Sequence, residues 1–469
     1  MIDTKAIRCS ILHLAFSGKL TEQNKLDGTA RELLSRINAK KNIEWTENTP
    51  YEIPDSWSWV RLADLYKINP KVEADITTKA AFIPMERISS GFDCTFTFET
   101  QNWEQASRNH TKFSDGDVAF AKITPCFENR KSFIAQGLPN SIGCGTTELV
   151  ILRQSEMLPE YTYYLLVDQR FINAGISSYK GTVGQQRVQS DVIREYLIPV
   201  APYSEQKRIV EKIEQTFSIL DTIDELQTKY ANNLSALKSK LIDAAIQGKL
   251  TKQLTEDGTA EDLYQQIQAE KQELIKAGKI KKEKPLPPIS EDEIPFEIPG
   301  NWKWVRLENV TTILGGYAFK SDNYAKDGFR VIRISDFNEN GLCNSKIVRH
   351  PFTNELSKFL IKKNDILLCM TGGTVGKSYL LNHLDEPMLL NQRVALIRTI
   401  FVSPKFINYY ILSSLIQGII AWRKKSTNDN ISMDDIIKFP LPLPPLAEQK
   451  RIVKRLGEVL AVCDGDFFN

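Results

Sequence analysis

The longest regular pattern in the chain is a stripe of apolar residues within Ser204–Gln247. This stretch contains no Gly and no Pro, and it lies between Pro202 and Gly248, residue types that commonly flank a helix. Its apolar residues mostly recur at steps of three and four, as on one face of an α-helix. They are Ile209, Ile213, Phe217, Leu220, Ile223, Leu226, Tyr230, Leu234, Leu237 and Leu241. We therefore predict one long helix, capped by Ser204, whose narrow apolar face needs a partner helix.

Both ends of the chain repeat parts of this helix. Glu448–Cys463 matches its first part, and Asp3–Gly18 matches its last part. Each segment carries apolar residues at helical spacing. We predict that these two terminal helices pack antiparallel against Ser204–Gln247, as a counterpart that is divided between the chain ends.

Four short motifs occur twice in the same order, at offsets of 230 to 245 residues. The copies are Gly18–Thr21 and Gly248–Thr251 (Gly-Lys-Leu-Thr), Asp27–Ala30 and Asp257–Ala260 (Asp-Gly-Thr-Ala), Ile53–Leu62 and Ile298–Leu307 (Ile-Pro-x-x-Trp-x-Trp-Val-Arg-Leu), and Glu205–Val210 and Glu448–Val453 (Glu-Gln-Lys-Arg-Ile-Val). So long a period indicates a duplicated domain with its connector rather than a solenoid. Between the motifs, Phe82–Glu195 and Phe319–Lys438 align only weakly. We predict two modules with different surfaces on a repeated frame.

The modules mix short β-rich runs with helical stretches such as Glu160–Ala174 and Lys405–Trp422. A further helix is expected after each Asp-Gly-Thr-Ala motif, with Asp27 and Asp257 as candidate caps. We predict an α+β fold: two globular modules separated by long antiparallel coiled-coil-like helices, in a circularly permuted internal repeat with pseudo-two-fold symmetry. The predicted segments are 1–50 (N-terminal helical region), 51–203 (first module), 204–293 (central long helix and linker), 294–445 (second module) and 446–469 (C-terminal helix).

The composition narrows the class of protein. Lys and Arg number 60 against 58 Asp and Glu, so the net charge is +2. This balance excludes a strongly basic coat for nucleic acid, although it allows a local basic surface. The seven cysteines include no C-x-x-C pair, so we expect neither a disulfide framework nor a zinc ribbon. No apolar run reaches the ~18–20 residues of a membrane helix, and we predict a soluble cytoplasmic protein.

No catalytic constellation is found in the sequence. Gly372–Ser378 is one residue short of a phosphate-binding loop, because Thr371 stands where that motif needs Gly. A simple turn and a DNA-backbone contact stay open as alternatives for this stretch. Glu205 and Glu448 each precede a Lys by two residues, as in part of a nuclease site, but their place at a helix start favours electrostatics with the helix dipole. The four histidines show no metal-binding spacing and no methyl-donor motif is present, so we expect no catalytic residue, metal or cofactor in this chain.

Binding therefore remains as the function to consider. The first module, Tyr51–Tyr203, has 15 basic and 18 acidic residues, and the second, Ile294–Pro445, has 19 and 13. Arg, Gln and Asn suit base edges, whereas Lys and Thr suit phosphates. The candidates for DNA contact are Lys122, Arg130, Lys131, Lys180, Thr182, Gln185, Gln186 and Arg187 in the first module, and Thr374, Lys377, Arg393, Arg423, Lys424, Lys425 and Asn428 in the second. Ordinary surface charge is the alternative for each cluster.

Taken together, the repeated motifs resemble the specificity (S) subunit of type I restriction-modification enzymes over essentially the whole chain. The resemblance implies two target recognition domains, each reading one part of a bipartite, asymmetric site in double-stranded DNA. It also implies a non-catalytic subunit whose helices bind two modification subunits, which methylate adenine with S-adenosylmethionine. In the family, two restriction subunits add ATP-driven translocation and cleavage. The methyl donor, ATP and Mg²⁺ are therefore expected on partner subunits rather than on this chain.

Two other interpretations stay open from the residues alone. One is a self-contained restriction and methylation enzyme, against which the missing methyl-donor and nuclease motifs argue. The other is a structural hub whose modules bind protein. Salt-sensitive, sequence-dependent DNA binding in complex with a modification subunit would distinguish recognition from both.

Overall fold

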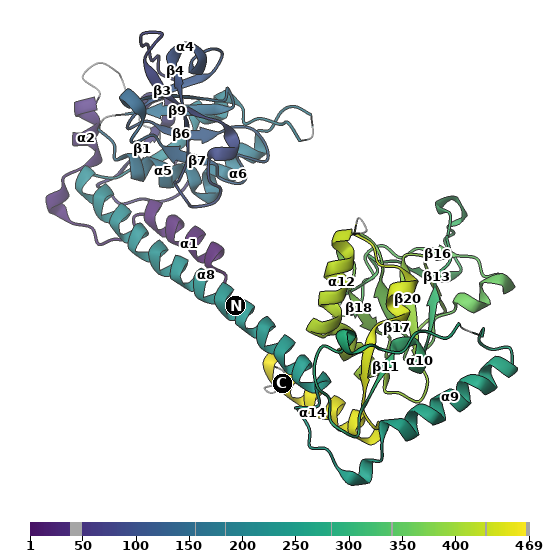
Figure 1. The fold of residues 1–469 in the computed structure, drawn as a ribbon. Coiled ribbons are helices and arrows are strands. Elements are labelled where there is room, and N and C mark those ends of the chain that lie inside the picture. Colours follow the sequence, from purple (N-terminus) through teal and green to yellow (C-terminus); the bar gives the residue numbers. More distant parts are fainter. Residues whose placement is uncertain are drawn as a thin grey trace. The chain divides into compact units, whose positions relative to one another are not determined.

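In the computed structural model the chain divides into two units, Met1–Thr228 and Lys229–Asn469. The structure describes residues 1–37, 49–154, 156–182, 184–282, 284–338, 341–426 and 429–465. Each unit combines one module of helices and sheets with helices that precede and follow it in the sequence (Figure 1). The predicted α+β fold class is confirmed.

The predicted long helix is present as α8, which spans 44 residues, Tyr203–Ile246. Its apolar stripe is not covered evenly. Ile209 is fully buried in the core of the first unit, and Ile246 is buried in the core of the second. Leu226 and Tyr230, between them, are exposed.

In the first unit, α1 (Thr4–Phe16) lies beside the first part of α8 (Figure 1). The Thr4 hydroxyl donates to Asp224 Oδ1 at 2.6 Å, whereas Arg8 Nη2 lies 2.8 Å from Asp221 Oδ1. A later residue of α1 therefore meets an earlier residue of α8. The two helices run antiparallel, as predicted.

In the second unit, α14 (Leu446–Asp464) packs against the last part of α8. Asp464, at the end of α14, forms an ion pair with Lys238. Ile452, nearer its start, belongs to the same buried core as Ile246. This order is again antiparallel, so the packing predicted for each terminal helix is confirmed within its own unit.

The described residues of the first module form three sheets, with strand orders β2-β9-β6-β7, β4-β3-β8-β5 and β1-β10. Its elements, with those that precede it, are η1 (Lys25–Asp27), α2 (Ala30–Ile37), β1 (Ser58–Arg61), α3 (Leu62–Leu65), β2 (Lys67–Ile68), β3 (Lys79–Ile83), η2 (Met85–Arg87), β4 (Glu99–Asn102), α4 (Trp103–Ala106), β5 (Thr111–Ser114), β6 (Val118–Ala121), β7 (Ser132–Ile134), η3 (Pro139–Ser141), β8 (Ile142–Gly145), β9 (Leu149–Arg153), α5 (Pro159–Val167), α6 (Gln169–Ser177), α7 (Ser190–Glu195) and β10 (Leu197–Val200).

The module of the second unit has the sheets β12-β20-β17-β18, β16-β13-β19, β11-β21 and β14-β15. Its elements, with those that precede it, are η4 (Thr255–Asp257), α9 (Ala260–Lys276), η5 (Glu291–Glu293), β11 (Lys303–Arg306), α10 (Leu307–Val310), β12 (Thr311–Gly315), η6 (Ser321–Asn323), β13 (Phe329–Ile332), β14 (Phe337–Asn338), β15 (Gly341–Leu342), β16 (Arg349–His350), η7 (Asn354–Phe359), β17 (Ile366–Cys369), η8 (Gly372–Thr374), β18 (Ser378–Leu380), β19 (Met388–Leu390), β20 (Val394–Thr399), α11 (Pro404–Leu412), α12 (Ser414–Ser426), α13 (Met433–Ile437) and β21 (Pro440–Leu443). Within the described ranges of both units, no helix is long and apolar enough to cross a membrane.

The fold of the modules is repeated even though their sequences are not. Each module has a four-stranded sheet of equivalent order, in which β9, β6 and β7 correspond to β20, β17 and β18. A buried aspartate pairs with an arginine of the neighbouring strand in both, Asp117 with Arg153 and Asp365 with Arg398, each at 2.6 Å. Strand burial depends on the pattern of apolar residues and not on their identity, so two diverged sequences can keep one fold.

Two helical predictions need correction. Glu160–Ala174 and Lys405–Trp422 are each two helices, α5 with α6 and α11 with α12, because the backbone is extended at Asp168 and Ser413. Asp168 accepts a hydrogen bond from Arg170 N at 2.7 Å and so caps α6. The cap of α9 also differs from the predicted one, by two residues. Thr259 rather than Asp257 forms its capping box.

Candidate nucleic-acid interface

In each unit the first and third repeated motifs meet around one buried carboxylate of the fourth motif. In the first unit Glu205 accepts hydrogen bonds from Trp57 Nε1 at 2.8 Å and from Gln23 Nε2 at 2.5 Å. In the second unit Glu448 accepts from Trp302 Nε1 at 2.8 Å and from Gln253 Nε2 at 2.9 Å. Burial raises the pKa of Glu205, and its hydrogen bonds oppose that rise. These carboxylates are part of the core, which explains the motif better than a nuclease site does.

The glycine of the first motif and the proline of the third are in direct contact. Gly18 has φ +67°, and a Cβ built on it would lie 2.3 Å from Pro54 Cγ. Gly248 has φ +72°, and its Cβ would lie 2.6 Å from Pro299 Cγ. Only glycine satisfies both the backbone and the space at these two positions. The repeated motifs therefore form a structural junction between module and helices.

The diverged parts of the modules contribute a second common feature, a pair of loops. In the first unit the β6–β7 loop (residues 122–131) lies against the α6–α7 loop (residues 178–189, of which 183 is outside the described residues). Val188 N donates to Lys122 O, and Thr124 N donates to Gln186 O, both at 2.9 Å. We call these two loops the loop pair of the first unit.

The second unit has an equivalent loop pair. It consists of the β17–β18 loop (residues 370–377) and the described part of the α12–α13 loop (residues 429–432). Ile431 N donates to Met370 O, and Gly372 N donates to Asp429 O, again both at 2.9 Å. The same two hydrogen bonds thus hold the same two loops in both modules.

All of the first-module candidates lie on this loop pair. Lys180, Thr182 and Gln185 are exposed, and Lys122, Gln186 and Arg187 are partly exposed. Arg187 forms an ion pair with Glu148, at 2.7 Å between Nη2 and Oε1. Sequence analysis missed Glu148, because it precedes β9 and is distant from the loops along the chain.

Arg130 and Lys131 have structural contacts instead. Arg130 is 5% exposed; its Nε donates to Val167 O at 2.9 Å, and its guanidinium lies 5.0 Å from the ring centroid of Phe92. Burial and these contacts favour a structural role for Arg130 over the predicted contact with DNA. Lys131 Nζ donates to Met85 O at 2.7 Å, which turns the ammonium toward the module.

In the second module Thr374 and Arg393 are exposed at the loop pair. Lys377 Nζ lies 5.3 Å from the ring centroid of Phe337. Two candidates at the end of α12 form ion pairs, Arg423 with Asp435 at 3.2 Å and Lys424 with Asp429 at 3.5 Å. The side chain of Lys425 and the whole of Asn428 lie outside the described residues.

The glycine-rich stretch of the second module is a turn. Gly372–Thr374 form a 3₁₀ turn, and the stretch continues into strand β18. A phosphate-binding loop would continue into a helix whose N-terminus faces the phosphates. The stretch is therefore a turn and does not have the form of a phosphate-binding loop, whereas its contact with a DNA backbone stays a prediction. Next to this loop pair in sequence, Trp422 is 63% exposed, with the Arg423 guanidinium 4.7 Å from its ring centroid.

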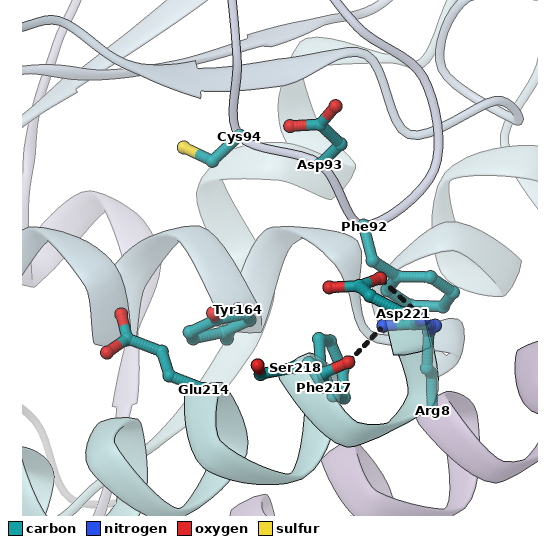
Figure 2. A pocket seen from close by; sticks show the side chains of 9 residues that line it. All are labelled: Arg8, Phe92, Asp93, Cys94, Tyr164, Glu214, Phe217, Ser218 and Asp221. Atoms are coloured by element: carbon teal, nitrogen blue, oxygen red, sulfur yellow. Dashed lines mark hydrogen bonds and ion pairs between the residues drawn. The ribbon is translucent and has the colours of Figure 1, made fainter. Parts of the chain in front are cut away.

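A separate cavity of about 600 Å³ lies in the first unit, between the residues after η2 and helix α8. Figure 2 shows the Arg8–Asp221 ion pair in this cavity, beside the rings of Phe92 and Phe217. The cavity lining is Arg8, Phe92, Asp93, Cys94, Tyr164, Glu214, Phe217, Ser218 and Asp221. Because carboxylates outnumber cations here, the lining of the cavity does not favour phosphate. Among the described residues, no group of three or more His, Cys, Asp or Glu could hold a metal.

Comparison with known proteins also finds two repeated regions in the chain. The family model of the type I restriction modification DNA specificity domain matches residues 54–231 and 299–464. These two ranges begin at Pro54 and Pro299, which are equivalent residues of the repeated third motif.

Relatives match over nearly the full length. The specificity subunit of the type I restriction enzyme EcoAI from Escherichia coli is 33% identical, over 98% of this chain and 89% of that protein. The corresponding EcoEI subunit from Escherichia coli is 31% identical with the same coverage. A chain in a solved structure of a type I R-M system has the same fold, with a TM-score of 0.62 and 21% identity over 89% of this chain and 93% of that one. The chain therefore belongs to the family of type I restriction-modification specificity subunits.

Proposed function

We propose that this chain is the non-catalytic DNA-recognition subunit of a type I restriction-modification complex, and that each module reads one half of a bipartite site. The observation that carries the proposal is the equivalent loop pair of the two modules. The two loop pairs have the same backbone contacts but different side chains, since Gln186 stands where the second unit has Asp429. The residues that bond to their first positions differ as well: Glu148 stands where the second unit has Arg393. One scaffold with two sets of polar side chains suits two different base sequences.

The charge distribution indicates how such a complex would share DNA contacts. The first module has more acidic than basic residues, and the second has more basic than acidic ones. Phosphate contacts dominate the affinity of most DNA-binding proteins and need positive charge. We infer that partner subunits supply much of the phosphate contact, whereas the loop pairs of this chain supply sequence discrimination.

The helices have apolar surface left for partners. In the first unit, Ile7 and Leu14 of α1 and Ile219 and Leu226 of α8 are exposed, each pair seven residues apart. In the second unit Tyr230 and Leu237 repeat that spacing and exposure. Exposed apolar residues at heptad spacing suit helices of another chain. We propose that they bind two modification subunits, which would hold S-adenosylmethionine, and that restriction subunits with ATP and Mg²⁺ join the same complex.

The test is to co-express this chain with its modification subunit and to map N6-methyladenine across a genome. The proposal expects a split motif, in which two short specific parts flank a gap of fixed length and unspecified sequence. A continuous motif would contradict recognition by both modules. DNA binding by the complex without any sequence preference would contradict the recognition function itself.

A further inference from the structure

The guanidinium of Arg187 is held along one edge and is partly exposed. Nε lies 2.9 Å from Glu148 Oε2, and Nη2 lies 2.7 Å from Glu148 Oε1. Nη1 donates to the backbone oxygen of Gln185 at 3.0 Å. A guanidinium has five N–H groups, so one N–H on Nη1 and one on Nη2 have no hydrogen-bond partner among the described residues. The Nη2 hydrogen that remains lies on the edge shared with Nη1, which faces away from Glu148. The side chain of Arg187 is 43% exposed.

The backbone around this arginine is also fixed. Arg187 N donates to Lys180 O at 3.0 Å, and Arg187 pairs with Ile123 of the other loop in an isolated β-bridge. Glu148 is tied to the same place, because its backbone oxygen accepts from Lys122 N at 2.9 Å. Both partners of the ion pair are thus positioned before any ligand arrives, which lowers the entropy lost on binding.

We propose that Arg187 reads a guanine in the half-site recognised by the first unit, with Glu148 as its positioning residue. This inference rests on the proposed function, because it needs the loop pair to face DNA. The two remaining donors match in number the O6 and N7 acceptors of guanine in the major groove. Phosphate is the poorer match, since Glu148 neutralises the charge that would attract a phosphate. Because Glu148 neutralises the charge of Arg187, recognition would depend on the direction of the remaining N–H donors rather than on attraction between charges.

The second unit lacks this arrangement. There, Met370 N donates to the backbone oxygen of Arg393 at 3.0 Å, so Arg393 takes the position of Glu148. An exposed arginine stands where the first unit has a carboxylate. The guanine reader is consequently specific to the first unit, and its loss should affect one half of the site only.

The experiment uses the full chain in complex with its modification subunit. Methylation motifs would be mapped for wild type, Arg187→Ala, Arg187→Lys, Glu148→Ala and the double variant Arg187→Ala/Glu148→Ala. Binding would then be measured on duplexes that carry each base pair at the altered position. We expect Arg187→Ala and Arg187→Lys to lose discrimination for one G·C pair by roughly 10-fold or more. Lysine keeps the positive charge but lacks the planar guanidinium, whose N–H donors point in fixed directions. Glu148→Ala should lose part of this discrimination while binding to unrelated DNA is kept, and the double variant should match Arg187→Ala.

The matched control is the ion pair of Arg61 with Glu195, at 3.1 Å, in which Arg61 is 42% exposed. It joins the last residue of β1 to the last residue of α7, and neither belongs to the loop pair, so Arg61→Ala should leave the motif unchanged. An unchanged motif in Arg187→Ala, an equal loss of affinity for all sequences that Arg187→Lys restores, or the lack of any G·C pair in the affected half would overturn the inference. A wild-type complex without a split motif would instead be a failure of the proposed function, and the inference would fall with it.

Discussion

The arginines of the first module show how burial separates residues of one type. Arg130 lies in one loop of the first unit's loop pair and Arg187 in the other, and the sequence predicts DNA contact for both. Arg130 donates to Val167 O and is buried, whereas the side chain of Arg187, paired with Glu148, is 43% exposed. Residue type predicts what an arginine can bind, but the fold decides whether the guanidinium faces a ligand or a backbone carbonyl.

At the same scale, the junction carboxylates allow a sharp test of stability. Trp57→Phe removes the indole N–H that Glu205 accepts at 2.8 Å. We expect a loss of about 1–3 kcal/mol in the free energy of unfolding, because a buried oxygen is left without its donor. Trp59→Phe is the matched control, since Trp59 Nε1 has no hydrogen-bond partner in the described part of the chain. Urea unfolding followed by circular dichroism would compare the two; equal losses would contradict a structural role for the Trp57 hydrogen bond.

The ionisation of Glu205 predicts a dependence of stability on pH. Its pKa is raised in the folded protein, chiefly by burial. The protonated carboxyl therefore stabilises the fold below the unfolded-state pKa, and this contribution is lost as the pH rises through the folded-state value. The unfolding free energy of the wild type minus that of Glu205→Gln should fall as the pH rises from about 4. A difference that increases with pH would mean that the folded protein favours the ionised form.

At the scale of elements, the apolar pattern predicted the long helix correctly but did not predict where two other helical stretches are interrupted. The apolar stripe of α8 predicted a helix correctly, because nothing along it interrupts the backbone hydrogen bonds. The apolar stretches around Asp168 and Ser413 also looked continuous, yet each is two helices. The Asp168 side chain caps the second helix by accepting a hydrogen bond from Arg170 N. A side chain that binds the backbone in this way competes with continuation of the first helix.

The terminal helix α14 offers the test at this scale. Ile452 and Leu456 are fully buried against the second unit, while the neighbouring Arg455 side chain is 61% exposed. We expect Leu456→Asp to prevent folding of the second unit, because a buried charge without a partner is strongly destabilising. Arg455→Asp should fold normally. Expression and circular dichroism would compare the two, and a folded Leu456→Asp protein would contradict the core role of α14.

At the scale of the whole molecule, the repeated frame and the diverged modules make one further prediction. Exchange of residues 51–203 for the first module of another family member should change one half of the recognised site and leave the other half unaltered. The physical reason is that each module has its own core and its own loop pair. Methylation mapping of the chimaera in complex with a modification subunit would test this. Changes in both halves would contradict independent modules.

The sequence by itself determined the internal repeat, the long helix, the antiparallel terminal helices and the family. These follow from identical motifs and from helical periodicity, both of which are visible along the chain. Only the tertiary structure revealed that the diverged modules share one fold, that the motifs close around Glu205 and Glu448, and that Glu148 holds Arg187. These facts depend on contacts between residues far apart in sequence, where burial and hydrogen-bond direction are decided by packing, and a single sequence carries no local pattern for them.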